Sequence, residues 1–460
     1  MNGHDRRTVA VPPRPVTQDS PYTAVRVLDL DLDEPDRLHS PSAAGPIDPR
    51  GRALVLARLH GHPLGVLTVT SPTGDAADGR RALARAVCRE LADTVAAHRA
   101  ADARALADRE SAVGGPVRGR LPGGDAAAAH PCRLPRSLVL RDPPLISVIV
   151  ATHNRVRPLR QCLDSLLRTG YPRLEVLVVD NAPDDDEAQA MVRGRYPGRI
   201  RYLREPVAGL ARAHNRALTE ATGTITAFTD DDTLVDPEWP AAIAESFAAS
   251  DRIGCVTGLI LPAELETRAQ ADLQRHGGYD KGFTARTWSL TDPPGDPLFP
   301  FTAGRFGSGA NMAFRTGLLR ALGGFDPATG TGTAARGGDD LLGFFRALVA
   351  GATLAYQPDA VVWHRPSQDP DALPAQAFGY GAGFGAFLTA AVANEPGMLP
   401  ALARRLPRGV RYAATRRRDA TAEHDGWSRR LSLLEVQGLL YGPLGYLRAS
   451  RQARRLASGS

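Results

Sequence analysis

The middle of the chain alternates between strand-like and helix-like segments. Residues 145–151 and 174–180 are continuous apolar runs, which are typical of strands buried on both faces. Two further segments, 200–203 and 225–229, are strand-like, and a helix pattern over 210–221 separates them. Repeated alternation of this kind predicts a parallel sheet with helices on both faces. Ligands of such sheets bind beyond the carboxyl ends of the strands.

The N-terminal part has the pattern of a small α+β domain. Residues 23–31, 53–61 and 63–71 have strand-like patterns. Over 79–108, apolar residues recur every four positions, which predicts one long helix. We recognise no catalytic constellation in this part of the sequence, and its role is not predicted.

Changes in composition divide the chain further. Residues 1–20 are Pro-rich and polar, and 111–143 are rich in Gly, Pro, Ala and Arg, which is typical of a linker. Two amphipathic helix patterns, near 398–418 and 431–456, follow in the Arg-rich C-terminal part. The predicted segments are a flexible tail (1–20), the small α+β domain (21–110), a linker (111–143), the α/β domain (144–370) and a helical C-terminal region (371–460).

The overall composition is that of a globular protein, because 43% of the residues are hydrophobic and 23% are charged. The net charge of +6 comes almost wholly from arginine, since Lys281 is the only lysine. This basicity favours anionic partners such as a phosphate donor, an acidic lipid surface or nucleic acid.

The cysteines are scattered along the chain, at Cys88, Cys132, Cys162 and Cys255. They form no CxxC pair and stand in no His/Cys cluster of the sequence, which argues for a reducing compartment and against structural zinc or a disulfide framework. The first residues lack the apolar segment of a secretory signal. Glycines and Pro374 interrupt the uncharged stretch 372–394, so we do not expect a membrane span there. The expected location is cytoplasmic.

Three adjacent acids, Asp230, Asp231 and Asp232, follow directly after a predicted strand. Like charges at this spacing raise one another's pKa, and a bound divalent cation removes that cost. Hard oxygen ligands suit magnesium or manganese, and such an ion would also stabilise a departing diphosphate. A solvated turn before the next helix is the alternative.

Eight short motifs occur in a fixed order between residues 144 and 364, about half of the chain. They are SVIVATHNR, LEVLVVDNA, AGLARAHNRAL, TGTITAFTDDD, GSGANMAFR, LGGFD, GGDD and YQPDAVVWH. Together they resemble family 2 glycosyltransferases of the GT-A fold, which implies an α/β nucleotide-sugar-binding domain with a mixed, mostly parallel sheet. The resemblance implies an enzyme that moves a sugar from a UDP-linked nucleotide-sugar to an acceptor hydroxyl, with inversion at the anomeric carbon.

The resemblance assigns the donor contacts mainly to strand ends. Thr152 would line the base, and Asp180 matches the carboxylate that accepts the N3–H of uracil. Arg212 lies in the first turn of a helix, where backbone N–H groups favour phosphate. A turn cap is the alternative for Asp180, and an exposed surface position is the alternative for Arg212. The residues predicted to bind the nucleotide-sugar are Thr152, Asn154, Arg155, Asp180, Asn181, Gly209, Arg212, Asn215, Asp230 and Asp231.

The motif Gly338-Asp339-Asp340 matches the acidic pair that opens a helix below the acceptor in this family. The resemblance implies that Asp340 is the catalytic base, with Asp339 beside it where Glu is more usual. Simple capping of the helix is the alternative. For the metal, Mn²⁺ or Mg²⁺, the implied ligands are Asp232 and His364, although a histidine in this position is as often just packed or solvated.

Small residues around Gly309 and Asn311 are expected to border the acceptor pocket. Trp363 is a candidate for stacking on a sugar face, with a core tryptophan as the alternative. The acceptor itself, a glycan, a lipid-linked sugar or a small molecule, is not predicted. The C-terminal arginines suit either a peripheral contact with anionic lipid or a solvated helix face.

Other functions fit the sequence less well. A P-loop needs GxxxxGK[ST], and Lys281 does not stand in that motif. Nucleic acid is not an expected partner, because aromatic residues rarely interleave with the basic ones. A catalytically inactive sugar- or nucleotide-binding scaffold of the same fold is the main alternative to an enzyme.

Overall fold

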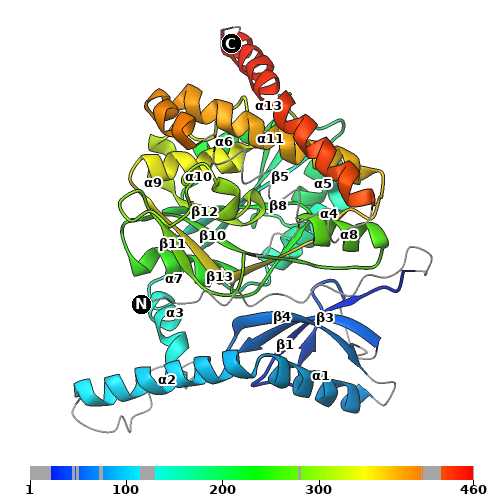
Figure 1. Ribbon diagram of the computed structural model, residues 1–460, viewed down its shortest axis with the longest axis vertical. Coiled ribbons are helices and arrows are strands. Elements are labelled where there is room, and N and C mark those ends of the chain that lie inside the picture. Colours follow the sequence, from blue (N-terminus) through cyan, green and yellow to red (C-terminus); the bar gives the residue numbers. More distant parts are fainter. Residues whose placement is uncertain are drawn as a thin grey trace. The chain divides into compact units, whose positions relative to one another are not determined.

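Figure 1 shows a computed structural model of the protein, whose residues pack into two compact units. It describes residues 22–43, 47, 51–71, 76–113, 130–277, 281–405, 407 and 426–458. The N-terminal unit comprises Met1–Pro143, Leu261–Thr284 and Trp363–Gln368. The sheet unit comprises Pro144–Ile260, Ala285–Val362 and Asp369–Ser460.

A mixed sheet and two long helices form most of the N-terminal unit, as the α+β pattern predicted. In the described residues the strand order is β2-β1-β3-β4, with β1 parallel to β3 and β3 antiparallel to β4. The strands are β1 (Arg26–Asp31), β2 (Leu38–His39), β3 (Gly51–Leu59) and β4 (His62–Ser71). Later parts of the chain join this unit, since Val25 pairs with Leu265 in an isolated bridge before helix α8 (Arg268–Gly277).

The single helix predicted over 79–108 is two helices in the structure, α1 (Ala76–Glu90) and α2 (Ala92–Val113). The buried face is the predicted one, because Leu83, Val87, Leu91 and Val95 all pack in the core of the unit. The break at Leu91 had no signal in the sequence, since alanine and leucine are among the best helix formers. A 3₁₀ turn, η2 (Pro131–Arg133), and the short helix α3 (Leu134–Val139) follow.

The sheet unit contains the large sheet, with the order β11-β13-β10-β12-β8-β5-β6-β7 among the described strands and with β9 paired to β13. Strands β8, β5, β6 and β7 are parallel, whereas β12 runs antiparallel to β8 and to β10. The α/β class with a mixed sheet is thereby confirmed. The strands are β5 (Ile146–Thr152), β6 (Leu174–Asn181), β7 (Arg201–Glu205), β8 (Ile225–Asp230), β9 (Thr233–Val235), β10 (Ile253–Pro262), β11 (Arg286–Trp288), β12 (Met312–Arg315) and β13 (Thr353–His364).

Helices cover both faces of the parallel strands. Ile149, Leu177 and Phe228 belong to the main core, whereas Val148 and Val150, which point the other way, are equally buried. This double burial explains the continuous apolar runs in the sequence. The helices between the strands are α4 (Val156–Leu166), α5 (Glu187–Arg195), α6 (Leu210–Glu220), α7 (Trp239–Ala249), α9 (Thr316–Ala321) and α10 (Asp339–Val349), with the 3₁₀ turns η3 (Ala303–Arg305) and η4 (Gly309–Asn311).

Two C-terminal helices, α11 (Ala372–Asn394) and α13 (Gly426–Ser458), lie side by side (Figure 1). They touch through glycines, because a Cβ atom on Gly381 would overlap the carbonyl oxygen of Glu435 and one on Gly438 would overlap that of Phe378. The glycines that interrupt the apolar stretch in the sequence are therefore contact points of one continuous helix.

Most of the amphipathic pattern predicted near 398–418 lies outside the described residues, including Arg408, Arg411 and the arginines at 416–418. The pattern predicted over 431–456 lies within α13. In the described part of the chain, none of the helices combines the length and the apolar character that a membrane span requires.

Two glycines of α11 provide a matched test of this helix contact. We expect Gly381→Ala to destabilise the sheet unit by about 1–3 kcal/mol, because the added methyl group must push two backbones apart. Gly379→Ala is the control, since nothing lies within 4 Å of a Cβ at that position. It should be neutral or stabilise by up to about 1 kcal/mol through helix propensity. Urea unfolding followed by circular dichroism measures both, and equal effects would contradict the close contact.

Candidate functional site

The carboxyl ends of three neighbouring strands meet at one edge of the large sheet. The register pairs Thr152 at the end of β5 with Asp180 near the end of β6. On the other side of β5, Ala151 pairs with Asp230 at the end of β8. The predicted donor residues on these three strands are therefore neighbours across the sheet.

The acidic triplet is held by a hydroxyl group and a guanidinium. Thr152 Oγ1 donates to Asp231 Oδ2 at 2.7 Å. Arg155 donates to Asp231 Oδ1 and to Asp232 Oδ2, both at 2.8 Å. Burial alone would lower the pKa of Arg155, but the carboxylates of Asp232 and Asp231 raise it above its usual value. The guanidinium shows that a positive charge fits between these two acids.

Asp180 is buried, with 1% of its surface exposed. Tyr202 donates its hydroxyl hydrogen to Asp180 Oδ2 at 2.7 Å, a contact that the sequence did not reveal. The other oxygen, Oδ1, is buried and accepts no hydrogen bond from the described residues. Burial raises the pKa of Asp180, while the Tyr202 hydrogen bond acts in the opposite direction. Asp180 thus keeps one acceptor atom without a protein donor.

The loop before α6 is held in place by Asn181. Its Oδ1 accepts from the backbone N–H of Gly209 at 2.9 Å, and its Nδ2 donates to the carbonyl of Val207 at 2.8 Å. Gly209 has a φ of 142°, which favours glycine. Arg212 is half-buried in the first turn of α6, and among the described residues no ion pair to it is found. Asn181 supports the loop, and a contact between Arg212 and a donor phosphate stays a prediction.

Two other predicted donor residues also act within the protein. Asn154, at a left-handed φ of 53°, donates to Asp184 Oδ2 at 2.6 Å and accepts from the Asp184 N–H at 3.0 Å. Asn215 donates to the carbonyl of Phe325 at 2.7 Å and accepts from its N–H at 2.8 Å. Their side chains fix loops around the site, and direct contacts with a nucleotide-sugar stay predictions.

The two acids at the start of α10, Asp339 and Asp340, lie in different environments. Asp340 is half-buried and accepts hydrogen bonds from the N–H groups of Gly309 and Leu341, both at 2.8 Å. Asp339 is buried, and burial raises its pKa well above the usual range, with the charges of Asp340 and Asp230 acting in the same direction. The turn η4 links the pair to the triplet, because Gly309 donates to Asp340 and the carbonyl of the next residue, Ala310, accepts from Thr229 Oγ1 at 2.9 Å, directly before Asp230.

A buried histidine next to the pair was not singled out from the sequence. His214 Nδ1 lies 3.8 Å from Asp339 Oδ2. Burial lowers the pKa of His214 to about 3, so the ring is neutral and supplies no positive charge to Asp339.

The residues predicted to bind the acceptor are placed less favourably. Asn311 is 1% exposed, donates to the carbonyls of Leu259 and Ala360, and accepts from Trp239 Nε1. Trp363 is 4% exposed and packs inside the protein. Only Gly309 adjoins a candidate catalytic group, because its N–H bonds to Asp340.

His364, the second predicted metal ligand, ends β13 and is half-buried. It groups with the N-terminal unit, whereas Asp232 belongs to the sheet unit. Its part in a metal site stays a prediction.

The groups of three or more metal-ligating side chains that the described residues contain lie in the N-terminal unit, not at the triplet. His60, His98, Asp102 and Cys132 form one such group, and Asp33, His60 and His130 form another. This corrects the conclusion from the sequence that His and Cys are too scattered for a cluster. The fold brings together residues up to 72 positions apart, which spacing along the chain does not show.

Comparison with known proteins finds the glycosyltransferase resemblance over part of the chain. Residues 147–323 match the family model described as glycosyl transferase family 2. An uncharacterized glycosyltransferase of Nostoc sp. is 29% identical over 132 residues, 28% of this chain and 41% of that protein. The uncharacterized glycosyltransferase EpsJ of Bacillus subtilis is 31% identical over 115 residues, 24% of this chain and 33% of EpsJ.

Among solved structures, a mannosyltransferase of Pyrobaculum calidifontis in complex with GDP-Man and Mn²⁺ aligns with a TM-score of 0.42. Its sequence is 24% identical, and the alignment covers 66% of this chain and 87% of that one. The chain spans less than half the length of the two curated relatives. Over residues 147–323, the chain is thus similar to glycosyl transferase family 2.

The raised pKa of Asp339 predicts a pH-dependent effect of Asp339→Asn on stability. Below the unfolded pKa of about 4, both states of the wild type are protonated, and the variant should match it. As the pH rises toward neutrality, unfolded Asp339 ionises while folded Asp339 keeps its proton, so the wild type loses stability relative to the variant. The variant should therefore be more stable by about 1 kcal/mol or more near pH 7.

Urea unfolding near pH 4 and near pH 7 measures this difference. Asp292→Asn, at an exposed position of the same unit, is the control and should change stability equally at both pH values. A gain from Asp339→Asn that is as large near pH 4 as near pH 7 would contradict a proton held by folded Asp339.

Proposed function

We propose that this protein is an inverting glycosyltransferase that moves a sugar from a UDP-linked donor to an acceptor hydroxyl. The observation that carries the proposal is the closeness of two acidic groups, the triplet after β8 and the pair at the start of α10. Gly309 donates to Asp340, and the carbonyl of its neighbour Ala310 accepts from Thr229, which directly precedes Asp230. A donor held by the triplet would thus place its anomeric carbon near the acidic pair.

Asp340 is the proposed catalytic base. Backbone N–H groups donate to both of its oxygens, and such bonds favour the ionised form of a carboxylate, which a base requires. One of the donors is Gly309, which the sequence placed at the acceptor side. Asp339, which retains its proton, is a positioning neighbour of the base. The base would take the proton of the acceptor hydroxyl as its oxygen attacks the anomeric carbon opposite the departing UDP.

The environment of Asp180 supports recognition of a nucleobase that donates a hydrogen bond. Its buried Oδ1 has no donor among the described residues, and the N3–H of uracil would supply one. A guanine N1–H offers a similar donor, so the preference for UDP needs a direct comparison. Arg212 and the N–H groups at the start of α6 suit the diphosphate.

Asp232 is the proposed protein ligand of Mn²⁺ or Mg²⁺. Arg155 lies between Asp231 and Asp232, so this position accepts a positive charge, and carboxylate oxygens suit both ions. The ion would neutralise charge on the leaving diphosphate. Ions of this kind commonly take one or two carboxylates and complete their shell with phosphate and water, which fits a triplet that forms no closed group of ligands.

Release of UDP and binding of UDP separate the roles of the two acids. With several UDP-sugars and Mn²⁺, we expect Asp340→Asn to lower turnover by about 10²–10⁴-fold, the usual contribution of a general base, while UDP binding stays nearly intact. Asp232→Ala should instead weaken the metal-dependent binding of UDP. The rise in unfolding temperature with UDP or with GDP measures binding of each nucleotide, and so compares uracil with guanine.

Asp292→Asn is the control and should change neither quantity, because Asp292 is exposed. Loss of binding alone in both variants would contradict Asp340 as the base. Absence of turnover by the wild type with every donor and acceptor, despite UDP binding, would favour the inactive scaffold. Stronger protection by GDP than by UDP would contradict the proposed donor.

We also propose that α13 contacts an anionic membrane surface, where a lipid-linked acceptor would be found. Leu433, Leu440, Leu444 and Leu447 recur on one side of the helix and are 55%, 76%, 47% and 49% exposed. Exposed arginines follow them toward the end of the helix, at Arg448, Arg451, Arg454 and Arg455. Apolar and basic residues together are typical of interfacial helices.

Sedimentation with vesicles of phosphatidylserine and phosphatidylcholine tests this contact. We expect the wild type to bind these vesicles, and the double change Leu440→Glu, Leu444→Glu to weaken binding by about tenfold or more, because two apolar side chains no longer enter the lipid. Leu290→Glu is the control, since Leu290 is also exposed but lies outside α13. Equal binding of all three proteins, or none by the wild type, would contradict the proposal.

A further inference from the structure

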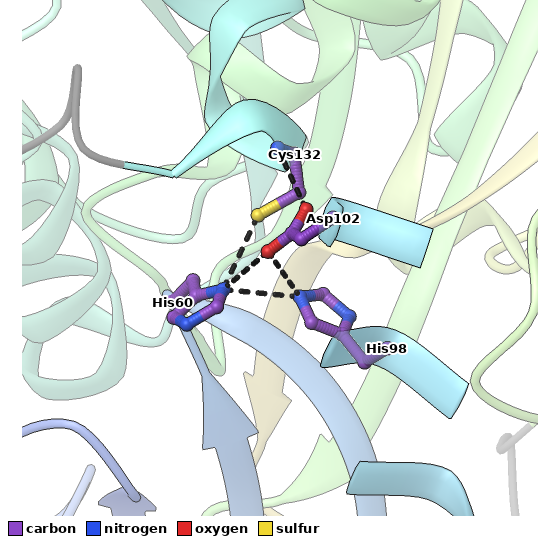
Figure 2. A group of neighbouring side chains, drawn as sticks. All are labelled: His60, His98, Asp102 and Cys132. Atoms are coloured by element: carbon purple, nitrogen blue, oxygen red, sulfur yellow. Dashed lines mark hydrogen bonds and ion pairs between the residues drawn. The ribbon is translucent and has the colours of Figure 1, made fainter. Parts of the chain in front are cut away.

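Four side chains of the N-terminal unit point toward one centre (Figure 2). His60 lies in the turn between β3 and β4, and Cys132 lies in the 3₁₀ turn η2. His98 and Asp102 are one helical turn apart on α2. His60, His98 and Asp102 are largely buried, with 8%, 17% and 13% of their side-chain surface exposed.

Four distances between the ligand atoms, from 2.9 to 3.7 Å, are close to the edges of a small tetrahedron. His60 Nδ1 lies 2.9 Å from Asp102 Oδ2, 3.2 Å from His98 Nε2 and 3.4 Å from Cys132 Sγ. His98 Nε2 lies 3.7 Å from Asp102 Oδ2, and all four atoms lie within 4.8 Å of one another. Ligands about 2.0–2.3 Å from a tetrahedral zinc ion stand roughly 3.3–3.7 Å apart.

Hydrogen bonds alone do not explain this arrangement. A ring nitrogen of histidine has one bonding direction in the plane of the ring, used either by a hydrogen or by a lone pair. His60 Nδ1 nevertheless has three polar atoms within 3.4 Å, one of them another ring nitrogen. A cation at the common centre would give each of the four atoms one bond of its own.

We propose that His60, His98, Asp102 and Cys132 bind a structural zinc ion. Imidazole nitrogen, thiolate sulfur and carboxylate oxygen are the usual zinc ligands, and thiolate favours zinc over magnesium or manganese. One thiolate and one carboxylate balance the two charges of the ion, so the loaded site is neutral, as a buried site requires. Four protein ligands leave no position for a substrate, which makes the role structural rather than catalytic.

The surroundings hold the ligands in this orientation. Asp33 Oδ2 lies 3.4 Å from the other ring nitrogen of His60, Nε2, which is the arrangement of a carboxylate that orients a zinc-bound histidine. The second oxygen of Asp102 accepts from the N–H of Cys132 at 3.0 Å. His130 stacks on His60, with ring centroids 3.6 Å apart. His60 itself has a left-handed φ of 55°, so the turn is set in an uncommon conformation that directs this ring.

An ion in this place would tie three distant parts of the chain together. It would join the β3–β4 turn, the middle of α2 and the segment that begins at His130. Because zinc binds the folded arrangement and not the unfolded chain, its binding energy would stabilise the N-terminal unit. This gives the unit a stabilising element that does not depend on glycosyl transfer.

The test uses the full chain, expressed without a histidine tag and dialysed after purification. We expect about one zinc per chain by mass spectrometry of the metal. After removal of zinc with a chelator, Co²⁺ should restore a tetrahedral visible spectrum with a thiolate charge-transfer band, because Cys132 is a ligand. Cys132→Ser should abolish that band and lower zinc affinity by at least tenfold, whereas Cys88→Ser, at an exposed cysteine, should leave both unchanged.

Two further variants test whether zinc binding and the Co²⁺ spectrum arise from this site. Asp33→Asn keeps all four ligands and should weaken zinc binding by roughly 10–100-fold if Asp33 orients His60. Asp232→Ala alters the proposed donor metal and should leave the Co²⁺ spectrum unchanged, so the two metal sites are tested independently. Absence of tightly held zinc and of a Co²⁺–thiolate band in the wild type would overturn the proposal, as would an unchanged band in Cys132→Ser.

Discussion

Several carboxylates of the sheet unit lie close together at the carboxyl ends of its parallel strands, and their mutual repulsion raises the free energy of the fold. Asp180, Asp231 and Asp339 are all buried there, and like charges in a low dielectric repel strongly. Each of these acids has different partners that reduce the repulsion. Asp231 receives a hydroxyl group and the guanidinium of Arg155, whereas Asp180 Oδ2 receives the Tyr202 hydroxyl. His214 beside Asp339 is neutral, and burial raises the pKa of Asp339, which favours its protonated form.

This unequal distribution gives two adjacent acids different chemistry. A pair of carboxylates that were both ionised would repel each other and the nearby Asp230. Asp340 accepts two backbone N–H bonds, which suits the role of base that we propose for it. In the proposed mechanism, a proton on Asp339 would reduce the repulsion that Asp340 meets so close to the triplet. Neighbouring acids with different pKa values and different roles are common in hydrolases and isomerases.

The sequence predicted those features that depend on local pattern. Buried strands such as 145–151 were recognised because both faces are covered, and Asp180 and the triplet were placed because strand ends follow from strand positions. Contacts between distant residues gave no such signal. Asn311 was expected to border the acceptor pocket, but its amide is buried. It forms hydrogen bonds with the Trp239 indole and with carbonyls of β10 and β13. The break between α1 and α2 was missed because its residues all favour helix.

The cluster around His60 was missed for the same physical reason, since sequence motifs detect metal sites only when pairs of ligands are close in the chain. Here His98 and Asp102 are the only neighbours, and a His/Asp pair at helical spacing is common. Ligand chemistry nevertheless distinguishes the two proposed cation sites of the chain. The triplet offers only hard oxygen, which suits Mn²⁺ or Mg²⁺ together with a diphosphate, whereas nitrogen and sulfur around His60 favour zinc. Under these two proposals, one ion would bind together with substrate, and the other would remain bound to the folded N-terminal unit.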